Sequence, residues 1–326
     1  MPKSILLPLL ADGEFRSGQV LADALGVSRT AVWKQLNRLA TESGVAVESV
    51  KGKGYRIKGG IDLLVEDQIS AAMAAPARAL LGELRIFDSV DSTNAEAMRR
   101  AQQGCAAGLV VTAESQTAGR GRRGRQWVSP YAGNLYVSLL WEYSQGAAVL
   151  EGMSLAVGVA VSRALQACDV GGIELKWPND VLHQGAKLGG ILLEMTGDTA
   201  GTCQVVIGIG LNVSMPADAG GAIDQDWTDI KTVTGGQHPG RNALLAALLS
   251  ELLPLAAGFE QQGFAHWRQE WQELDAFAGS PVILNTGASQ LGGIARGVDE
   301  RGALQLETTT GIQPVYGGEI SMRPAP

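Results

Sequence analysis

The chain has 326 residues, of which 45% are hydrophobic, and its formal net charge is −7. This length predicts two or three domains, and the apolar content is high enough to build a core, which excludes a disordered protein. The three cysteines are widely spaced and odd in number, so reduced thiols are expected rather than a disulfide framework or a zinc site.

The beginning of the chain does not have the pattern of a secretory leader, because Pro8 and Asp12 interrupt the apolar run from Ile5 to Ala11. No apolar stretch reaches the roughly 20 residues that a membrane crossing needs. We therefore expect a soluble, cytoplasmic protein without a membrane partner. Proline is tolerated in the first turn of a helix, so Pro8 predicts a short first helix that begins near Ser4.

The segment from Ser17 to Ala40 predicts two helices with a sharp joint. Apolar residues recur at helical spacing in both, with Val20 in the first helix and Val32 in the second. Gly26 occupies the joint at one of the positions that are close-packed in a helix-turn-helix. Ser28 is the expected N-cap of the second helix.

The stretch KGKGYRI at residues 51–57 resembles a short basic hairpin, or wing. Residues 1–60 carry nine Lys or Arg and five Asp or Glu, a net charge of +4, so the remaining chain carries −11. A winged helix-turn-helix that binds DNA is therefore favoured, and a winged fold used for protein contact or dimerisation is the alternative. The predicted DNA-binding residues are Ser28, Arg29, Thr30, Trp33, Lys34, Lys51 and Lys53.

After a connector that begins at Ile61, residues 84–90 have strand character, and the sequence DSTN precedes a helical stretch at 95–103. Thr93 or Asn94 in this quartet fits a helix cap. Alternatively, Ser92, Thr93 and Asn94 offer hydroxyl and amide groups to a small polar ligand. The quartet by itself does not decide between these two interpretations.

The stretch TAGRGRRGRQW at 117–127 follows a strand predicted at 109–113 and precedes another at 134–141. Its glycines allow the backbone to approach a ligand closely, and its arginines suit phosphate or carboxylate groups. Because it is short and embedded between strands, an ordered loop that binds a small anion is favoured over a nucleic-acid arm or a solvated run of charge.

Further elements follow in the order helix, strand, turn and strand. A helix is expected at 154–167, and the turn K-W-P-N-D divides the extended run at 174–195, whose second strand opens at Ile191. Lys176 and Lys187 lie at the predicted strand ends, where an ammonium group can neutralise a phosphate or a reacting carboxylate. The glycines of the strand at 205–213 permit close approach of a ligand, and the loop after it can order over a ligand near Trp227.

Taken in their order and spacing, these motifs closely resemble those of the bifunctional biotin–protein ligase and biotin operon repressor family. The resemblance rests on the winged helix-turn-helix, D-S-T-N, Q-T-A-G-R-G-R-R-G-R, K-W-P-N-D, K-L-G-G-I and G-G-E-I-S at 317–321. It implies an α+β protein in which a winged helix-turn-helix occupies residues 1–62. A central mixed-sheet α/β domain of the class II synthetase and biotin ligase type is implied at 63–273, and an SH3-like β-barrel at 274–326.

The resemblance also implies a two-step reaction, that of a biotin–[acetyl-CoA-carboxylase] ligase. Biotin reacts with ATP, accompanied by Mg²⁺, to give biotinyl-5′-AMP and pyrophosphate. A lysine of the biotin carboxyl carrier protein then takes the biotinyl group and releases AMP. Biotinyl-AMP is also implied to act as the corepressor that favours a homodimer on operator DNA of the biotin biosynthesis operon.

By the same likeness, each motif receives a role in the site. Biotin is assigned to Ser92, Thr93, Asn94, Gln116, Arg120, Gly121, Arg122 and Lys187, and catalysis to Arg120, Arg122 and Lys187. ATP and the adenylate are assigned to Arg122, Lys176, Asn179, Asp180, Asn212 and Trp227, with Asp180 also a candidate for Mg²⁺. The roles of Arg123 and Arg125 stay open.

Rival functions are a lipoate-type protein ligase, a metabolite-sensing repressor without ligase activity, and a nucleic-acid-binding protein that uses the Arg/Gly loop directly. The winged module and the terminal barrel argue against a lipoate ligase. The presence of Lys187, Arg120 and Arg122 argues against a sensor without catalysis.

Overall fold

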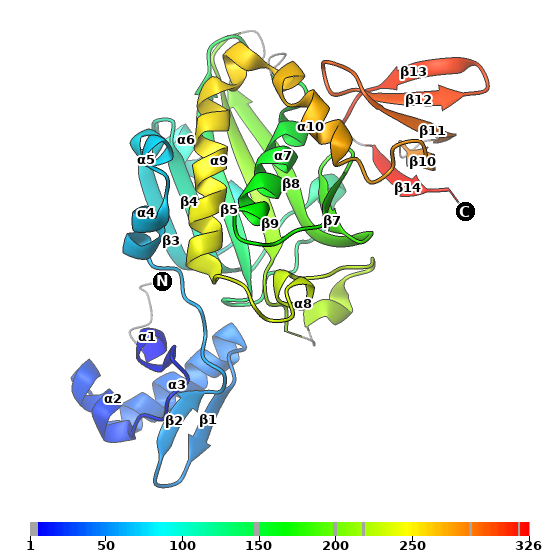
Figure 1. The fold of residues 1–326 in the computed structure, drawn as a ribbon. Coiled ribbons are helices and arrows are strands. Elements are labelled where there is room, and N and C mark those ends of the chain that lie inside the picture. The colour runs from blue at the N-terminus through cyan, green and yellow to red at the C-terminus, as the bar shows by residue number, and fades with distance from the viewer. Residues whose placement is uncertain are drawn as a thin grey trace.

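The computed structural model describes residues 6–146, 150–197, 201–216, 219–286, 289–318 and 320–325. A small N-terminal unit stands at one end of the molecule and is joined by one extended segment to a large central unit (Figure 1). A small β-sheet at the C-terminus lies on the other side of the central unit. The chain thus places its DNA-binding candidates and its ligand-binding candidates in different units.

The N-terminal unit is a winged helix-turn-helix, as predicted. Its helices are α1 (Leu6–Leu10), α2 (Gly18–Leu25) and α3 (Arg29–Ser43), and its antiparallel wing is β1 (Val47–Val50) with β2 (Gly54–Ile57). Leu10, Leu21, Val32 and Ile57 are buried in a separate core. Tyr131 of the central unit packs against this core, whose buried residues are otherwise separate from those of the central core.

Local signals explain where these helices begin and end. Ser28 caps α3, since its Oγ accepts a hydrogen bond from the Ala31 N–H at 3.2 Å. Pro8 lies in the first turn of α1 as expected, while the predicted start at Ser4 lies outside the described residues. Val20 lies in α2 as predicted, although its side chain is 55% exposed. One expectation is wrong: Gly26 is not close-packed. A Cβ at Gly26 would meet nothing within 4 Å, so its left-handed conformation (φ 65°) is the reason for glycine there.

The predicted connector is shorter than expected. Beyond Val65 the chain forms α4 (Glu66–Ala72) and α5 (Ala75–Leu80), which pack against α9 (Arg241–Gln262). Ile69 and Ala77 on these helices are fully buried in the central core. Only residues 61–65 therefore link the two units.

A buried ion pair holds this linker to the central unit. Arg241, at the start of α9, is 1% exposed, and its Nη1 lies 2.7 Å from Oε2 of Glu114, which is 4% exposed. Arg241 also donates to the backbone carbonyls of Asp62 (2.6 Å) and Asn134 (3.0 Å). Oε1 of Glu114 accepts from the Leu64 N–H at 2.7 Å. Linker, sheet and helix are thus joined through one carboxylate and one guanidinium.

The central sheet has seven strands in the order β3-β4-β5-β9-β8-β7-β6. The pair β3–β4 is parallel and the other pairs are antiparallel, which makes the sheet mixed as predicted. The strands are β3 (Glu83–Val90), β4 (Leu109–Gln116), β5 (Asn134–Tyr143), β6 (Ile173–Lys176), β7 (Asp180–His183), β8 (Ala186–Gly197) and β9 (Cys203–Asn212).

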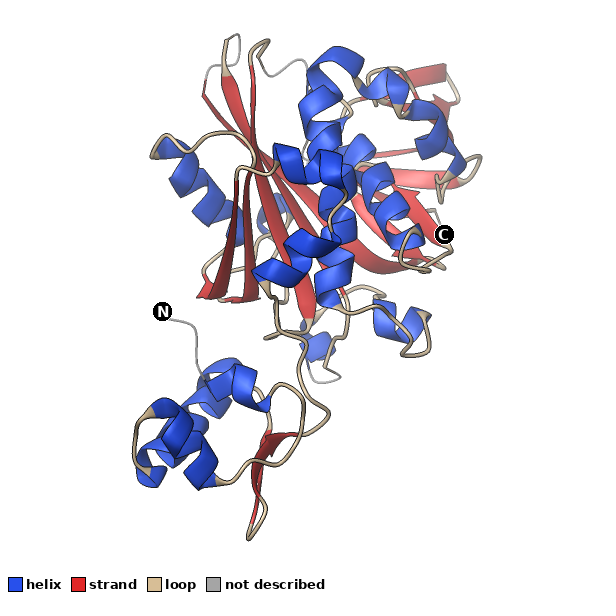
Figure 2. Cartoon of the chain, turned by 60° about the vertical axis from the view of Figure 1, so that its left-hand side comes forward, coloured by secondary structure: helices blue, strands red, loops and turns tan. Residues whose placement is uncertain are grey.

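Helices cover both faces of this sheet (Figure 2). On one face α7 (Met153–Gln166) and α9 bury Val110 and Ile207, while on the other α6 (Thr93–Gln102) buries Val111 and Val206. Neighbouring strand residues thus alternate between the two faces. A short helix, α8 (Ile230–Val233), and 3-10 turns at Arg122–Gly124, Ala219–Ala222 and Phe264–His266 complete the connections.

The run at 174–195 contains more strand than predicted. It forms β6, β7 and β8, and β8 begins at Ala186 rather than at Ile191. Gly189 and Gly190, which come before the predicted start at Ile191, pair with Leu211 and Gly210 of β9 and so belong to the ladder. Lys187 therefore lies inside a strand.

The C-terminal unit is a five-stranded antiparallel sheet in the order β13-β12-β11-β10-β14. It follows α10 (Arg268–Glu273) and packs its buried Val282, Ala295 and Leu304 against the central core. Its strands are β10 (Pro281–Asn285), β11 (Gln290–Val298), β12 (Leu304–Thr308), β13 (Gly311–Val315) and β14 (Ser321–Pro324).

Within the described residues, one helix, α9, is long and apolar enough to cross a membrane by length and composition. In this structure α9 packs against α7, α4 and α5, and Leu245, Leu249 and Leu253 on it are fully buried. These contacts are those of a core helix.

Candidate biotin and nucleotide site

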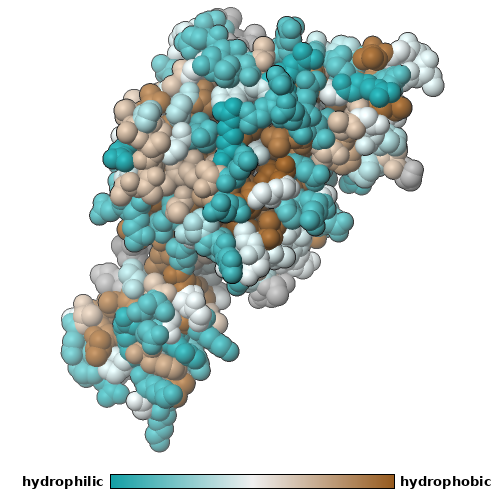
Figure 3. Space-filling model, in the orientation of Figure 1, coloured by the Kyte–Doolittle hydropathy of each residue, from teal (hydrophilic) through white to brown (hydrophobic). Residues whose placement is uncertain are grey.

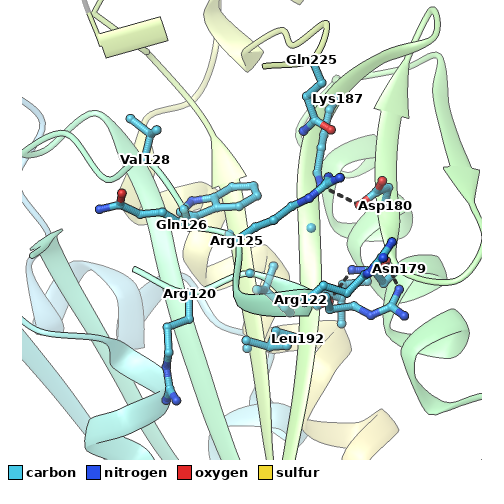
Figure 4. A pocket seen from close by; sticks show the side chains of 18 of the residues that line it. Arg120, Arg122, Arg125, Gln126, Val128, Asn179, Asp180, Lys187, Leu192 and Gln225 are labelled. Carbon is cyan, nitrogen blue, oxygen red and sulfur yellow. Dashed lines mark hydrogen bonds and ion pairs between the residues drawn. The ribbon is translucent and has the colours of Figure 1, made fainter. Parts of the chain in front are cut away.

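A cavity of about 630 Å³ opens in the central unit, and every residue predicted for biotin, ATP or catalysis lines it. The lining comes from α6, the Arg/Gly loop, β6 to β9 and the loop before α8, with β14 of the C-terminal unit closing one side. Figure 4 shows Arg120 on one side of the view and Arg122 beside Asn179 on the other, the side on which Asp180 and Lys187 lie. Segments that are distant in sequence thus form one polar pocket.

At one end of the cavity, one residue of the DSTN quartet caps a helix and the next two lie at the cavity wall. Ser92 caps α6 by accepting from the Ala95 N–H, so neither Thr93 nor Asn94 serves as the cap. The N–H and the hydroxyl of Thr93 donate to Oε1 of Gln116 at 2.9 and 3.2 Å. Thr93 and Asn94 are therefore placed by other residues at the cavity wall.

The Arg/Gly loop is attached on both sides of the cavity. Arg120 Nη1 lies 3.0 Å from Oε1 of Glu194 on β8. Arg122 donates to Oδ1 of Asn179 at 2.8 Å and to the Ile320 carbonyl at 3.1 Å. The loop thus spans the cavity from the central sheet to the C-terminal unit. Arg120 and Arg122 contact different residues on different sides of the cavity.

The two arginines whose roles were open differ in their surroundings. Arg123 adopts a left-handed conformation (φ 59°) and donates to Oγ of Ser321 at 2.9 Å, so it ties the loop to β14. Arg125 lines the cavity, and Figure 4 shows it extending across the cavity toward Lys187 and Asp180. Arg125 is therefore the better placed of the two to meet an anion.

A carboxylate lies between two lysines on the opposite wall. Lys187 Nζ is 2.7 Å from Oδ1 of Asp180, and Lys176 Nζ is 3.0 Å from Oδ2. Burial raises the pKa of Asp180, but the charges of Lys187 and Lys176 outweigh this and hold the pKa below its usual value. Two lysines against one carboxylate leave one excess positive charge, which favours an anionic ligand.

These contacts do not fit Asp180 as a ligand of a resident Mg²⁺. Both of its carboxylate oxygens are engaged by ammonium groups. Across the part of the chain that is described, no group of three or more His, Cys, Asp or Glu side chains is arranged to hold a metal.

The loop before α8 runs beside the start of β8. The Lys187 N–H donates to the Asp226 carbonyl at 3.0 Å, and the Thr228 N–H donates to the Lys187 carbonyl at 2.9 Å. Asn212 is 4% exposed and its Nδ2 donates to the Thr228 carbonyl at 3.1 Å. Asn212 therefore holds the loop that carries Trp227 against the cavity, and residues 217–218 of this loop lie outside the described residues.

Some lining residues were missed by sequence reasoning, chiefly Trp127 and residues 320–323. The glycines of β9 were a signal for Trp127 alone, since they predicted a close approach, but the approaching groups belong to the protein. A Cβ at Gly208 would lie 2.1 Å from Asn94, and one at Gly210 would lie 2.5 Å from the Trp127 ring. These glycines make room for the cavity walls.

The predicted DNA-binding side chains lie exposed on the N-terminal unit: Arg29, Thr30, Trp33 and Lys34 on α3, and Lys51 and Lys53 in the wing turn. Ser28 is exposed as well but caps α3. Teal, hydrophilic atoms cover most of this unit in the view of Figure 3. The basic side chains are thus available on α3 and on the wing.

Three family models match successive parts of the chain: an HTH domain at 3–56, the Biotin/lipoate A/B protein ligase family at 86–212, and the Biotin protein ligase C terminal domain at 277–323. The chain is 40% identical over 320 residues to the bifunctional ligase/repressor BirA of Escherichia coli (strain K12), across 98% of this chain and 97% of that protein. Identity to the bifunctional ligase/repressor BirA of Bacillus subtilis (strain 168) is 32% over 316 residues, across 96% of this chain and 95% of that protein. A solved structure of the biotin protein ligase from Aquifex aeolicus, in complex with biotin and ATP, resembles this fold with a TM-score of 0.64 and 28% identity, across 75% of this chain and 100% of that chain.

Proposed function

Because this chain belongs to the family of bifunctional biotin–protein ligases and repressors, we propose that it activates biotin with ATP and transfers the biotinyl group to a lysine of the biotin carboxyl carrier protein of acetyl-CoA carboxylase. The observation that carries the proposal is the cavity, which joins a hydroxyl and amide end at Thr93 and Gln116 to a cationic end at Lys176 and Lys187. A ligand with a polar head and a reacting carboxylate fits this division.

In the first step, an oxygen of the biotin carboxylate forms a bond to the α-phosphorus of ATP. The bond from this phosphorus to the β-phosphate oxygen breaks, and pyrophosphate leaves. We assign Lys187 and Arg122 to the charge that develops around this phosphate, because preorganised cations stabilise such charge without reorganising. Lys176 and Asn179 are assigned to the nucleotide side, and Trp227 to the adenylate.

In the second step, the amine of the carrier lysine attacks the biotinyl carbonyl carbon. The bond from this carbon to the phosphate oxygen breaks, AMP departs, and the amine loses a proton as the amide forms. The cations that served the first step face the same phosphate in the second. One set of side chains is therefore sufficient for both steps.

Mg²⁺ is proposed to enter with ATP, since phosphate oxygens are among its usual ligands. The ion pairs of Asp180 with Lys187 and Lys176 give no support to a resident metal at this carboxylate. Asp180 is instead assigned to holding the two ammonium groups at the cavity wall.

The repressor role uses the N-terminal unit. We propose that biotinyl-AMP, as corepressor, favours a homodimer that presents two winged units to a two-fold operator in the cytoplasm. A coupling free energy of about 1–3 kcal/mol between adenylate and dimer is enough for a switch. The chain would then divide into a DNA-binding domain at 1–62, a catalytic domain at 63–273 and a C-terminal domain at 274–326.

Purified protein is expected to catalyse ATP–pyrophosphate exchange that depends on biotin. Labelled pyrophosphate entering ATP measures the first step alone, without a carrier protein. The same assay with lipoate is expected to give background exchange. Exchange that is absent with biotin but present with lipoate would make this a lipoate-type ligase, and binding of biotin without exchange would make it a sensor.

Replacing Arg29 or Lys34 with alanine is expected to weaken operator binding, because both are exposed cations among the predicted DNA-binding residues, and we assign one phosphate contact to each. The plot of log affinity against log salt has a slope of about −0.9 per phosphate contacted, so each loss is expected to flatten the slope by about 0.9. Fluorescence anisotropy over a salt series measures this slope. Arg85→Ala, at an exposed arginine of the central unit, is the control, and an unchanged slope in all variants would remove α3 from the DNA interface.

A further inference from the structure

Glu194 lies on β8 and joins two residues of the proposed biotin site. Its Oε2 accepts a hydrogen bond from Nδ2 of Asn94 at 2.8 Å, and its Oε1 lies 3.0 Å from Nη1 of Arg120. Its side chain is 27% exposed, and Glu194 is not among the described residues that line the cavity. Any influence of Glu194 on a ligand therefore passes through Asn94 and Arg120, both of which line it.

Glu194 shares in setting which way the Asn94 amide faces. The Glu194 carboxylate, at 2.8 Å, and the Leu192 carbonyl, at 3.3 Å, both accept from the amide nitrogen of Asn94, so its oxygen faces away from them. That oxygen accepts from the buried Ser138 hydroxyl at 2.6 Å. Ser138 Oγ also lies 2.9 Å from Oγ1 of Thr93, which donates to Gln116. Because the Ser138 hydroxyl has a single proton, donating it to Asn94 fixes the Ser138 hydroxyl as well.

Glu194 also determines where Arg120 lies. Figure 4 shows Arg120 pointing away from Lys187 and Asp180, whereas Arg122 and Arg125 extend toward them. Without a counter-charge at Glu194, Arg120 would be free to follow the other arginines. The ion pair keeps one guanidinium beside Asn94 and leaves the other cations for the phosphate.

We propose that Glu194 is a positioning residue for biotin, which fixes the Asn94 amide and holds Arg120 at the biotin end of the cavity. This inference rests on the proposed function and deepens it. Glu194 supports the recognition of biotin and has no direct part in the recognition of ATP.

Glutamine is an informative replacement because it keeps the shape of Glu194 but has only one accepting oxygen. Both partners of Glu194 are donors, so in Glu194→Gln either Asn94 or Arg120 faces an N–H group. The double variant Asn94→Asp with Glu194→Gln restores a donor opposite an acceptor at both contacts. A role through hydrogen-bond direction therefore predicts that the second change repairs part of the first.

The test measures KM for biotin, KM for ATP and kcat in pyrophosphate exchange with the full chain, together with biotin binding by calorimetry. Glu194→Gln is expected to raise KM and Kd for biotin about 10- to 100-fold, the range for lost hydrogen bonds to a charged group. KM for ATP is expected to change less than threefold. The double variant is expected to bind biotin more tightly than Glu194→Gln.

Glu142→Gln is the matched control, because Glu142 is an exposed glutamate on β5 that accepts from Gln204 at 3.2 Å. It is expected to keep the wild-type constants. The inference would be overturned if KM for biotin and KM for ATP changed equally, or if biotin binding stayed unchanged. It would also be overturned if the double variant bound biotin no more tightly than Glu194→Gln. Wild-type protein without biotin-dependent exchange would instead contradict the proposed function, and calorimetry would still report on Glu194.

Discussion

Replacing Lys187 with alanine is expected to lower the rate of biotin-dependent pyrophosphate exchange by about 10²- to 10³-fold, the range found when one preorganised group that stabilises developing charge is removed. Lys187 is 15% exposed and is paired with Asp180 at 2.7 Å, so its ammonium group is held in place before any substrate binds. Its removal also leaves Asp180 with Lys176 as its remaining ammonium partner in the trio. The positive excess charge of this wall is then lost.

The exchange rate at saturating biotin and saturating ATP separates a loss of catalytic rate from weaker substrate binding. Lys231→Ala, at an exposed lysine on α8, is the control and is expected to retain wild-type exchange. Thermal unfolding of both variants checks that the fold is kept. An exchange rate for Lys187→Ala within a few-fold of wild type would remove Lys187 from the mechanism.

Replacing Glu114 with alanine is expected to lower the free energy of unfolding by about 3–5 kcal/mol, because it leaves the buried Arg241 guanidinium without its counter-charge. Glu114 is 4% exposed and Arg241 is 1% exposed. The same change removes the acceptor of the Leu64 N–H, so the linker loses a contact to the catalytic unit. Urea unfolding followed by tryptophan fluorescence measures the loss.

An exposed pair on the neighbouring strand provides the control. On β3, Oε1 of Glu83 lies 2.5 Å from Nη2 of Arg85, and the two side chains are 43% and 49% exposed. Solvent-exposed pairs contribute about 0–1 kcal/mol, so Glu83→Ala is expected to change stability by no more than that. The double variant Glu114→Met with Arg241→Met is expected to recover much of the stability lost in Glu114→Ala, since it leaves no buried charge unpaired. Equal losses for Glu114→Ala and Glu83→Ala would contradict a structural role for the buried pair.

Most of the fold followed from local signals in the sequence. Apolar periodicity predicted α3, a helix was also expected where α7 lies, and strands were predicted where β3, β5 and β9 lie. The helices α4, α5 and α9 were not predicted. A different kind of error arose where tertiary pairing overrides a local signal. Gly189 and Gly190 lie before the predicted strand start at Ile191, yet they are ladder residues of β8, because the strand opposite them supplies hydrogen bonds that no local pattern reports.

The composition of the cavity followed from the sequence in part. The motifs D-S-T-N, K-W-P-N-D and the Arg/Gly loop stand out because hydroxyl, amide, lysine and arginine groups occur beside turns, where side chains meet ligands. Glu194 and Trp127 did not stand out. A single glutamate in an apolar strand, or a tryptophan after a basic loop, is as common in a sheet or a core as in a site.

What the sequence by itself determined is the set of chemical groups and the elements that carry them: a basic winged module, a mixed α/β unit with lysines and arginines at its loops, and a small C-terminal β unit. Only the tertiary structure decided which groups meet. Arg120 pairs with Glu194, Arg122 reaches Asn179 and the C-terminal unit, and Asp180 lies between Lys176 and Lys187. Helical and strand periodicities depend on neighbours along the chain, whereas these pairs depend on burial and charge between segments far apart in sequence, which only the packed fold brings together.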